Sequence, residues 1–435
     1  MIPRRPFTVL VLLLTGFGVL AAFYPLLNTA WLIAAAILLA AAAIDFLLAM
    51  NLRPPEVERN VPASVSLSTW VDVHLTFRNT QSRGTMRLRV YDFHPQTVTA
   101  EGLPRDLAVD AGHFVDMTYS IRPSERGPMT FTSCELRIAS PMRLWWRRRI
   151  VDAETEVRTY PNYNTISKLL AFEVDNRLQL AGVRLTRRRG QGIEFEQLRD
   201  YRHGDSLRSI DWKATARVQR LIAREYQDER DQQIVFMLDA GRRMIAKDAE
   251  LSHFDHALNA MLLLSYVALN QGDAAGVMTV AENRKWLPPM KGVGAINGIL
   301  NHVYDTQPQP IEIDYVAAAT ELAVRQRRRS LIIILTNVRE EDSQDLHTAT
   351  ELLKRRHLVI LGSLRERVLD KSLDKSIHGF DDALLYAATN QYLESRRASQ
   401  DLLRARGIFV EDCLSDELPA QITNRYLAIK RSGML

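Results

Sequence analysis

Acidic and basic side chains are concentrated between residues 192 and 239. Asp200, Asp205 and Asp211 have the side chains that perform general acid–base chemistry when one of two neighbouring carboxyl groups has a raised pKa. Arginines stand near each of these carboxylates in the sequence, and ion pairs with them would lower the carboxyl pKa values. We therefore expect a structural network with partner contacts here, and catalysis is the alternative. The predicted network comprises Glu194, Asp200, Tyr201, Gly204, Asp205, Arg208, Asp211, Trp212, Arg217 and Arg224.

Two other features of this stretch bear on its role. Trp212 is a large aromatic residue between charged neighbours, and we expect it to pack into a core. The basic run at 187–192, RRRGQG, contains two glycines but lacks the Gly-Lys-Ser/Thr ending of a phosphate-binding P-loop. We therefore exclude nucleotide binding at this run.

Beyond residue 233 short apolar runs alternate with helical patterns, which is typical of a doubly wound α/β domain with a largely parallel sheet. Ligands of such folds bind beyond the carboxyl ends of the strands. Asp239 and Asn337 each follow a buried strand directly, so they are the first candidates for a site. The predicted strands are 234–238, 276–281, 331–335, 358–361 and 408–410, and the predicted helices are 254–270, 295–304, 315–327, 343–355 and one within 381–406.

Residues 56 to 160 alternate between apolar and polar side chains and predict an antiparallel, immunoglobulin-like β-sandwich. For the run at 145–149, WWRRR, two interpretations remain open. It either touches the membrane surface or forms a strand or loop with solvated arginines, and the second is favoured. The predicted strands are 71–77, 86–92, 114–121, 129–138 and 156–160.

The chain begins with two apolar runs of the length that a helix needs to cross a bilayer. Arg4 and Arg5 precede the first run and Arg53 follows the second, which places both ends in the cytoplasm by the positive-inside rule. A cleaved signal peptide is the rival interpretation. Asp45, the one charge in the second run, is expected to reach headgroup water or a neighbouring helix.

Length and composition are consistent with several folded domains. The 435 residues are 46% hydrophobic and 25% charged, and the net charge of +5 does not single out a nucleic-acid partner. Two distant cysteines provide no disulfide framework or zinc site. We predict a transmembrane hairpin at 1–52, a sandwich at 53–162, a linker segment at 163–232 and the α/β domain at 233–435.

Several of these segments together resemble a bacterial family called domain of unknown function 58. The resemblance rests on 192–217, 224–226, 229–231 and the strand ending in Asp239, together with RGP at 126–128 and SPMRL at 140–144. It implies two spans in the bacterial inner membrane, a cytoplasmic strand-rich segment and a domain similar to von Willebrand factor type A. It further implies a MoxR-type AAA+ ATPase as partner. The expected function is that of a non-enzymatic assembly factor that matures or remodels other proteins.

Domains of type A often bind Mg²⁺ at an adhesion site with an Asp-x-Ser-x-Ser loop. In this chain Gly241 and Arg243 stand at the two serine positions, and Asn337 stands where a second Asp is expected. Arg242 and Arg243 add positive charge that disfavours a divalent cation. The resemblance thus implies a degenerate site without cofactor, although any metal would bind Asp239 and Asn337. Alternatively, Arg243 replaces the cation, pairs with Asp239 and receives a partner's carboxylate.

Two other functional classes remain alternatives to the assembly factor. One is a Mg²⁺-dependent adhesion module, which the missing serines count against. The other is a hydrolase of unrecognised type, for which the sequence contains no recognisable constellation.

Overall fold

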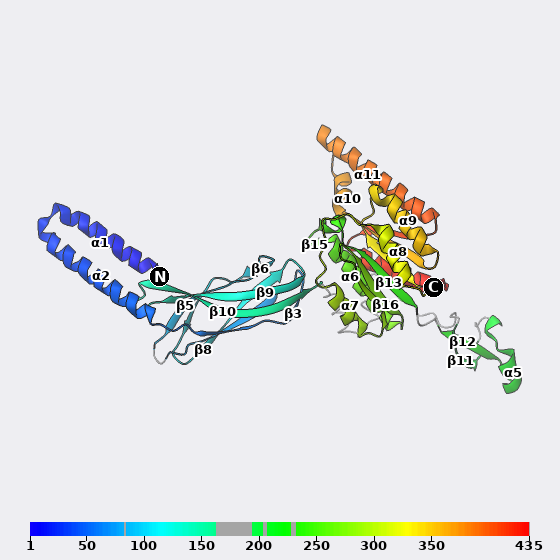
Figure 1. Cartoon of the computed structure of the whole chain (residues 1–435), viewed down its shortest axis with the longest axis horizontal. Helices are drawn as coiled ribbons and strands as arrows, with labels where there is room; N and C mark the ends of the chain where they lie inside the picture. Colours follow the sequence, from blue (N-terminus) through cyan, green and yellow to red (C-terminus); the bar gives the residue numbers. More distant parts are fainter. Residues whose placement is uncertain (82–83, 162–193, 203–206, 228–231, 435) are drawn as a thin grey trace. The chain divides into compact units, whose positions relative to one another are not determined.

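The computed structural model describes residues 1–81, 84–161, 194–202, 207–227 and 232–434. Contacts divide the chain into two units, Met1–Tyr160 and Pro161–Leu435, which are described separately below. Figure 1 shows their elements. The sequence also predicts a helix at 166–181. This segment, the basic run at 187–192, the motif at 229–231, and Gly204 and Asp205 all lie outside the described residues.

The first unit begins with two antiparallel helices, α1 (Arg5–Phe23) and α2 (Asn28–Met50), joined by a short turn. Both helices are long and apolar enough to cross a membrane. They approach closely at Gly18, where a Cβ atom would lie 2.8 Å from Nε1 of Trp31. The indole of Trp31 donates a hydrogen bond of 3.0 Å to the Leu14 carbonyl, which leaves no room there for a larger residue. The two predicted apolar helices are therefore confirmed.

Two sheets follow, antiparallel except where β3 pairs with β10, and their facing side chains form one core. The prediction of a strand-rich middle is confirmed, although the strand expected at 156–160 begins earlier, at Trp145. One sheet has the order β1-β10-β9-β5-β7 with β3 beside β10, and the other has the order β2-β4-β8-β6. The strands are β1 (Ile2–Pro3), β2 (Glu56–Asn60), β3 (Ser64–Ser66), β4 (Val71–Arg78), β5 (Met86–Asp92), β6 (Val98–Glu101), β7 (Arg105–Val109), β8 (Phe114–Pro123), β9 (Gly127–Ala139) and β10 (Trp145–Tyr160).

Asp45 joins α2 to the turn between β9 and β10, contrary to the expectation that it reaches headgroup water or another helix. Its carboxylate accepts hydrogen bonds from Ser140 Oγ at 2.5 Å, from the Met142 amide at 2.8 Å and from the Leu144 amide at 3.1 Å. Because a buried carboxylate needs such donors, the turn satisfies Asp45 and the helix holds the turn in place.

The start of β10 adds further bonds to α2. Trp145 donates to the Ala42 carbonyl, and Arg147 donates to the carbonyls of Ala49 and Leu52. The run at 145–149 forms a strand, as the favoured interpretation predicted. Its Arg147, however, is bonded to α2 rather than solvated.

In the second unit a six-stranded sheet has the order β17-β16-β13-β18-β19-β20, parallel except for β17 at one edge. The predicted doubly wound arrangement is thus confirmed as a mixed, mainly parallel sheet. The sequence did not reveal β17, whose run KWLPPMK contains two prolines that an edge strand tolerates. The strands are β13 (Gln233–Asp239), β16 (Ala274–Val280), β17 (Lys285–Lys291), β18 (Leu331–Thr336), β19 (Leu358–Arg365) and β20 (Phe409–Leu414).

Helices cover both faces of this sheet, because successive side chains of each buried strand point to opposite sides. Ile234 and Phe236 pack in the core beneath α6, α7 and α12, whereas Val235 and Met237 pack beneath α8, α9 and α11. Neither α10 nor α12 was predicted. The helices are α6 (His253–Asn270), α7 (Ala295–Val303), α8 (Tyr315–Arg325), α9 (Ser343–Lys354), α10 (Arg367–Asp374), α11 (Phe380–Ala405) and α12 (Leu418–Ser432).

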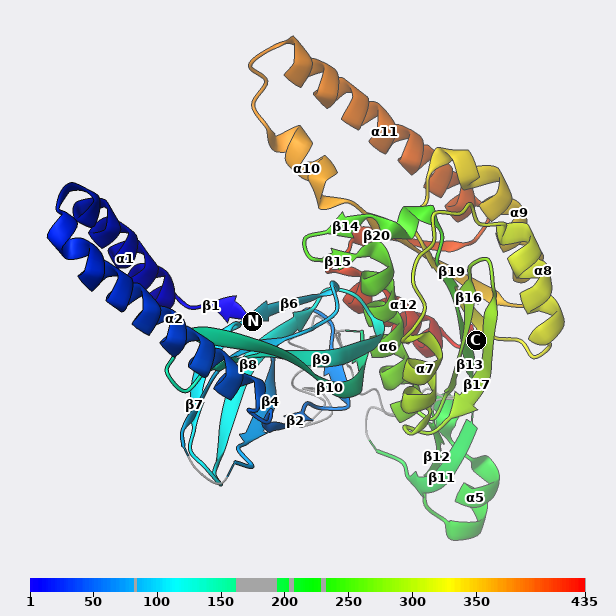
Figure 2. The ribbon, with the colours of Figure 1, turned by 60° about the vertical axis from the view of Figure 1, so that its left-hand side comes forward.

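Helix α10 and the first half of α11 extend away from the sheet as an arm (Figure 2). The second half of α11 is anchored by buried Leu393, Arg396 and Leu403. Towards the tip apolar side chains are exposed instead, and Phe380 is 81% exposed. The arm therefore presents apolar surface that the described domain leaves uncovered.

The stretch expected to carry an ion-pair network contains an antiparallel hairpin, formed by β11 (Glu194–Asp200) and β12 (Ile222–Gln227). A short helix, α5 (Trp212–Val218), lies between the two strands.

Candidate functional site at the carboxyl edge of the sheet

The order of the strands reverses between β13 and β18, and this is where doubly wound folds bind ligands. Asp239 ends β13, and its carboxylate accepts hydrogen bonds from the Gly241 amide at 2.8 Å, the Tyr315 hydroxyl at 2.7 Å and Thr336 Oγ1 at 2.5 Å. Burial raises the pKa of Asp239, against the effect of these donors. The candidate residue is therefore a buried carboxyl group surrounded by neutral donors.

The two arginines of this loop differ in exposure. Arg243 is buried and forms an ion pair of 2.9 Å with Glu341, while its charge lowers the pKa of Asp239. Arg242 is half exposed and bonds Glu312 at 3.0 Å. The idea that Arg243 offers an exposed guanidinium to a partner is thus wrong, because its side chain is only 7% exposed.

The donor set around Asp239 does not fit Mg²⁺. Hydroxyl and amide groups already donate to both carboxylate oxygens, and the positive charge of Arg243 is close enough to act on the carboxyl group. The cavity beside it, lined by Gly241, Arg242, Ile311 and Tyr315 among others, measures about 10 Å³, or about the space of one water. Neither a hydrated cation nor a substrate has room there.

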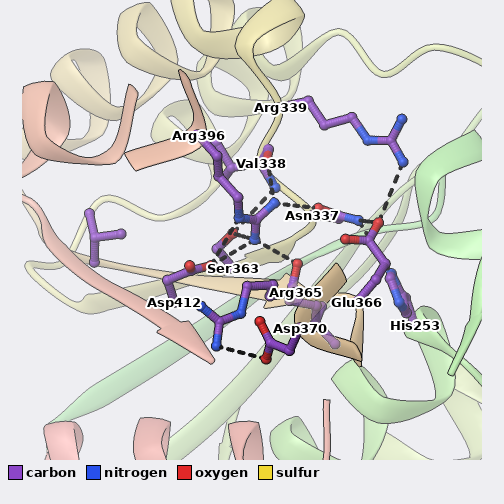
Figure 3. Close-up of polar contacts among 12 residues, drawn as sticks. His253, Asn337, Val338, Arg339, Ser363, Arg365, Glu366, Asp370, Arg396 and Asp412 are labelled. Carbon is purple, nitrogen blue, oxygen red and sulfur yellow. Dashed lines mark hydrogen bonds and ion pairs between the residues drawn. The ribbon is translucent and has the colours of Figure 1, made fainter. Parts of the chain in front are cut away.

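Asn337 belongs to a different cluster, although it was predicted to share a site with Asp239. Its amide nitrogen donates to Glu366 Oε1 at 2.7 Å, and its carbonyl oxygen accepts from Nη1 of Arg396 at 2.7 Å (Figure 3). The preceding residue, Thr336, is the one that bonds Asp239. Because side chains alternate along a strand, consecutive residues at its end serve separate clusters.

Arg396 lies at the centre of this second cluster (Figure 3). Its side chain, 1% exposed, reaches from α11 across the ends of β18, β19 and β20. Nη2 forms an ion pair of 2.7 Å with Asp412 and donates to Ser363 Oγ and the Leu364 carbonyl, each at 2.6 Å. Nη1 also donates to the Val338 carbonyl at 2.5 Å. Such complete pairing is what a buried guanidinium requires, and it fixes α11 on the sheet.

His253, the first residue of α6, contacts the same cluster through Asn337 at 3.4 Å. Burial lowers the pKa of His253, and the nearby carboxylate of Glu366 opposes this effect. Sequence reasoning missed Arg396, although one signal existed. Leu393, Arg396, Gln400 and Leu403 recur at helical spacing, which places Arg396 on the buried stripe of α11.

The structure describes only part of the predicted network at 194–224. Asp211 caps α5 by accepting hydrogen bonds from the amides of Lys213 and Ala214, each at 3.0 Å. Asp200 and Arg220 are 3.9 Å apart and largely exposed, so that their attraction is weak. Tyr201 is joined to Leu221 through its backbone.

Trp212 is 67% exposed and not packed into a core, because it occupies the first turn of a short helix without buried residues. Arg217 lies in the last turn of the same helix. The side chains of Glu194, Arg208 and Arg224 lie outside the part of the chain that the structure describes, as do Gly204 and Asp205.

The chain is thus a protein with two apolar N-terminal helices, an antiparallel sandwich and a doubly wound α/β domain. Residues 197–376 match the model of a family described as protein of unknown function DUF58. This match confirms the family resemblance for that segment. The chain is also 22% identical over 258 residues to the uncharacterized protein YeaD of Bacillus subtilis (strain 168), covering 59% of this chain and 61% of that relative.

Two solved structures are similar in part. An aerotolerance-related membrane protein from Bacteroides fragilis NCTC 9343 is 12% identical and has a TM-score of 0.27, with 45% of this chain and 98% of that chain covered. A FixG-related protein from Vibrio parahaemolyticus is 9% identical with a TM-score of 0.19, with 25% of this chain and 97% of that chain covered. Neither likeness assigns a function to this chain.

Proposed function

We propose that this chain is a membrane-anchored, cytoplasm-facing interaction and assembly factor that works with a MoxR-type AAA+ ATPase and has no enzymatic activity of its own. Two apolar helices flanked by Arg4, Arg5 and Arg53 support the bacterial inner membrane as its location. The α/β domain is of the von Willebrand factor A type with a degenerate adhesion site. Its mainly parallel sheet, with Asp239 at the end of the first strand, supports this assignment.

The observation that carries the proposal is the exposed apolar surface of the α10–α11 arm. Exposed apolar patches of this kind are typical of protein–protein contact sites. The exposed side chains of the arm are Val368, Ile377, Phe380, Leu384, Leu385 and Tyr386.

The charges of the arm favour a protein over the membrane as its partner. Residues 367–382 contain four acidic and three basic side chains, so they do not attract an anionic lipid surface. The cavity beside Asp239 points the same way, because its volume of about 10 Å³ leaves no room for a substrate.

Co-purification of the detergent-solubilised full chain with the MoxR-type ATPase of the same organism tests this proposal. We expect the ATPase to be retained in at least one of three states: with ATP, with ADP and without nucleotide. Phe380→Ser and Leu385→Ser should each weaken retention at least fivefold.

A matched control lies on the same helix. Leu402 is 48% exposed and Leu385 is 49% exposed, but Leu402 lies in the anchored second half of α11, outside the arm. Leu402→Ser should therefore retain the ATPase. Loss of retention by the wild type in every nucleotide state would refute the partnership. If Leu385→Ser and Phe380→Ser both retained the ATPase as well as the wild type does, only the assignment of the arm as the contact surface would be refuted.

A further inference from the structure

A cluster of arginines surrounds the N-terminal end of α1 in the first unit. Strand β1 pairs with the start of β10, and the Arg4 amide donates a hydrogen bond of 2.9 Å to the Leu144 carbonyl. The guanidinium of Arg4 is thereby placed over the Trp146 ring, 4.3 Å from its centre. Arg89 approaches the same ring at 5.5 Å. Arg4 is thus fixed in position by backbone pairing and by an aromatic face.

Positive charges outnumber negative charges around Arg4. Burial lowers the pKa of Arg4, and the positive charges of Arg143 and Arg87 lower it further. Asp106 opposes this effect, but it is already bonded by Arg89 at 2.7 and 2.9 Å. Within the described residues neither Arg4, Arg87 nor Arg143 forms an ion pair with a carboxylate, and Nη1 of Arg4 is buried without a hydrogen-bond partner. The cluster therefore has the electrostatics of an anion site.

The position of the cluster indicates which anion it binds. Arg4 immediately precedes the first apolar helix, and Asp45 of the second helix holds the turn that carries Arg143. Met142 of that turn is exposed beside it. If the hairpin crosses a membrane, as the proposed function requires, the three arginines and Trp146 lie at the depth of the lipid headgroups. A phosphate at that depth offers several acceptor oxygens to guanidinium donors.

We propose that Arg4, Arg87 and Arg143 bind the phosphate of an anionic lipid headgroup at the cytoplasmic surface of the membrane. Trp146 forms the floor of the site beneath Arg4. The bound lipid supplies the negative charge that the protein lacks here, and it reinforces the contact between the helical hairpin and the sandwich.

Native mass spectrometry of the full chain in neutral detergent tests the site, with dioctanoyl phosphatidylglycerol, dioctanoyl phosphatidylcholine and inorganic phosphate as separate probes. We expect phosphatidylglycerol to bind, phosphatidylcholine to bind at least fivefold more weakly and phosphate not to bind. Arg4→Gln and Arg143→Gln should each weaken phosphatidylglycerol binding about tenfold, which corresponds to one charge-assisted hydrogen bond.

Arg149→Gln is the matched control, since it removes the same charge from β10, the strand of Trp146. Residues alternate along β10, so Arg149 points to the face opposite Trp146. Its substitution should leave lipid binding unchanged. If Arg4→Gln and Arg149→Gln weakened phosphatidylglycerol binding equally, the site would be overturned. If inorganic phosphate bound as strongly as phosphatidylglycerol, a lipid would be overturned as the ligand.

Alkaline carbonate extraction of membranes containing the same variants separates this proposal from the one on which it rests. Release of the wild type by carbonate would refute membrane insertion itself. Retention in the membrane together with absent phosphatidylglycerol binding would refute the lipid site alone.

Discussion

Two polar clusters lie at the same edge of the α/β sheet, and they use opposite electrostatics. Around Asp239 a buried carboxyl group is surrounded by an amide and two hydroxyl groups. Around Arg396 a buried guanidinium is paired with the carboxylate of Asp412. The first cluster has a raised carboxyl pKa and joins the ends of two strands to α8, whereas the second joins three strands to α11.

The difference shows that position at a ligand-binding edge does not by itself make a site. Both clusters satisfy their buried polar atoms mainly with protein partners, and this is what makes buried polar groups tolerable. The surface that we propose for contact lies elsewhere in the domain, at the exposed apolar tip of the arm. Arg396 links the polar edge of the sheet to the arm, because it fixes the half of α11 from which the arm extends. The polar edge thus supports the proposed contact surface without forming it.

Removing the paired charge should have the largest effect on stability. Arg396→Met leaves the Asp412 carboxylate and several acceptors buried without donors, so we expect a loss of about 4 kcal/mol in the unfolding free energy of the α/β domain. Pulse proteolysis of the detergent-solubilised full chain across a urea series measures this loss.

The neighbouring residue provides the control for this substitution. Arg397 is exposed on the same helix, and Arg397→Met should change stability by less than about 0.5 kcal/mol. In the double variant with Asp412→Leu, part of the loss should be recovered, because no unpaired charge remains. Additive losses would show that Arg396 and Asp412 do not act as a pair.

Removing the carboxyl group of the Asp239 cluster should lower the unfolding free energy by a smaller amount. Asp239→Ala leaves the Gly241 amide without its acceptor, but Tyr315 and Thr336 can still bond one another at 2.9 Å. We expect a loss of about 2 kcal/mol by the same proteolysis assay. Tyr315→Phe removes only one donor and should cost about 1 kcal/mol. A loss in Asp239→Ala as large as that in Arg396→Met would contradict the distinction between the two clusters.

The fold was more predictable from sequence than these clusters. Strands β13 and β18 are continuous apolar runs, so their type and their burial on both faces followed from composition. Asp239 and Asn337 were correctly placed at strand ends, but their partners come from α8, from Glu366 directly after β19, and from α11. Those contacts depend on packing between distant segments, which local spacing does not encode.

The same limit explains the other errors. Arg396 stands next to exposed Arg397 in the sequence, and only the helical stripe of α11 distinguishes them. Trp212 was expected in a core because large aromatic residues usually pack, yet the short helix α5 has no buried residue. Asp45 bonds a turn almost one hundred residues away in the chain, and no local pattern indicates that partner.

The pH dependence of the unfolding free energy is expected to be a smaller effect, and it tests the raised pKa of Asp239 directly. Burial raises the folded-state pKa of Asp239 above its ordinary value of 3.8, so the folded state binds this proton more tightly than the unfolded state. Its stabilising contribution is therefore complete below pH 3.8 and is lost as pH rises through the folded pKa. Asp239→Asn lacks this proton and should show a flatter fall in stability above pH 4.

The comparison requires urea series at several pH values. Near pH 4 the wild type and Asp239→Asn should differ by less than about 1 kcal/mol, since a protonated carboxyl and an amide are similar in size and charge. The difference should then shift in favour of Asn as pH rises. A difference that stays constant would show that folding does not shift the pKa of Asp239, and one that shifts in favour of the wild type would show that the carboxylate is stabilised as an anion.

The smallest effect on the unfolding free energy is expected for a substitution of Arg243. Its partner, Glu341, is 67% exposed, and exposed ion pairs contribute little, so Arg243→Ala should cost about 1 kcal/mol or less. Loss of the guanidinium also removes a positive charge that lowers the pKa of Asp239, and the fall in stability with rising pH should become steeper. Because the side chain is buried, retention of the ATPase in the co-purification assay should stay unchanged. Reduced retention in Arg243→Ala with wild-type stability would instead assign a contact role to the Asp239 edge.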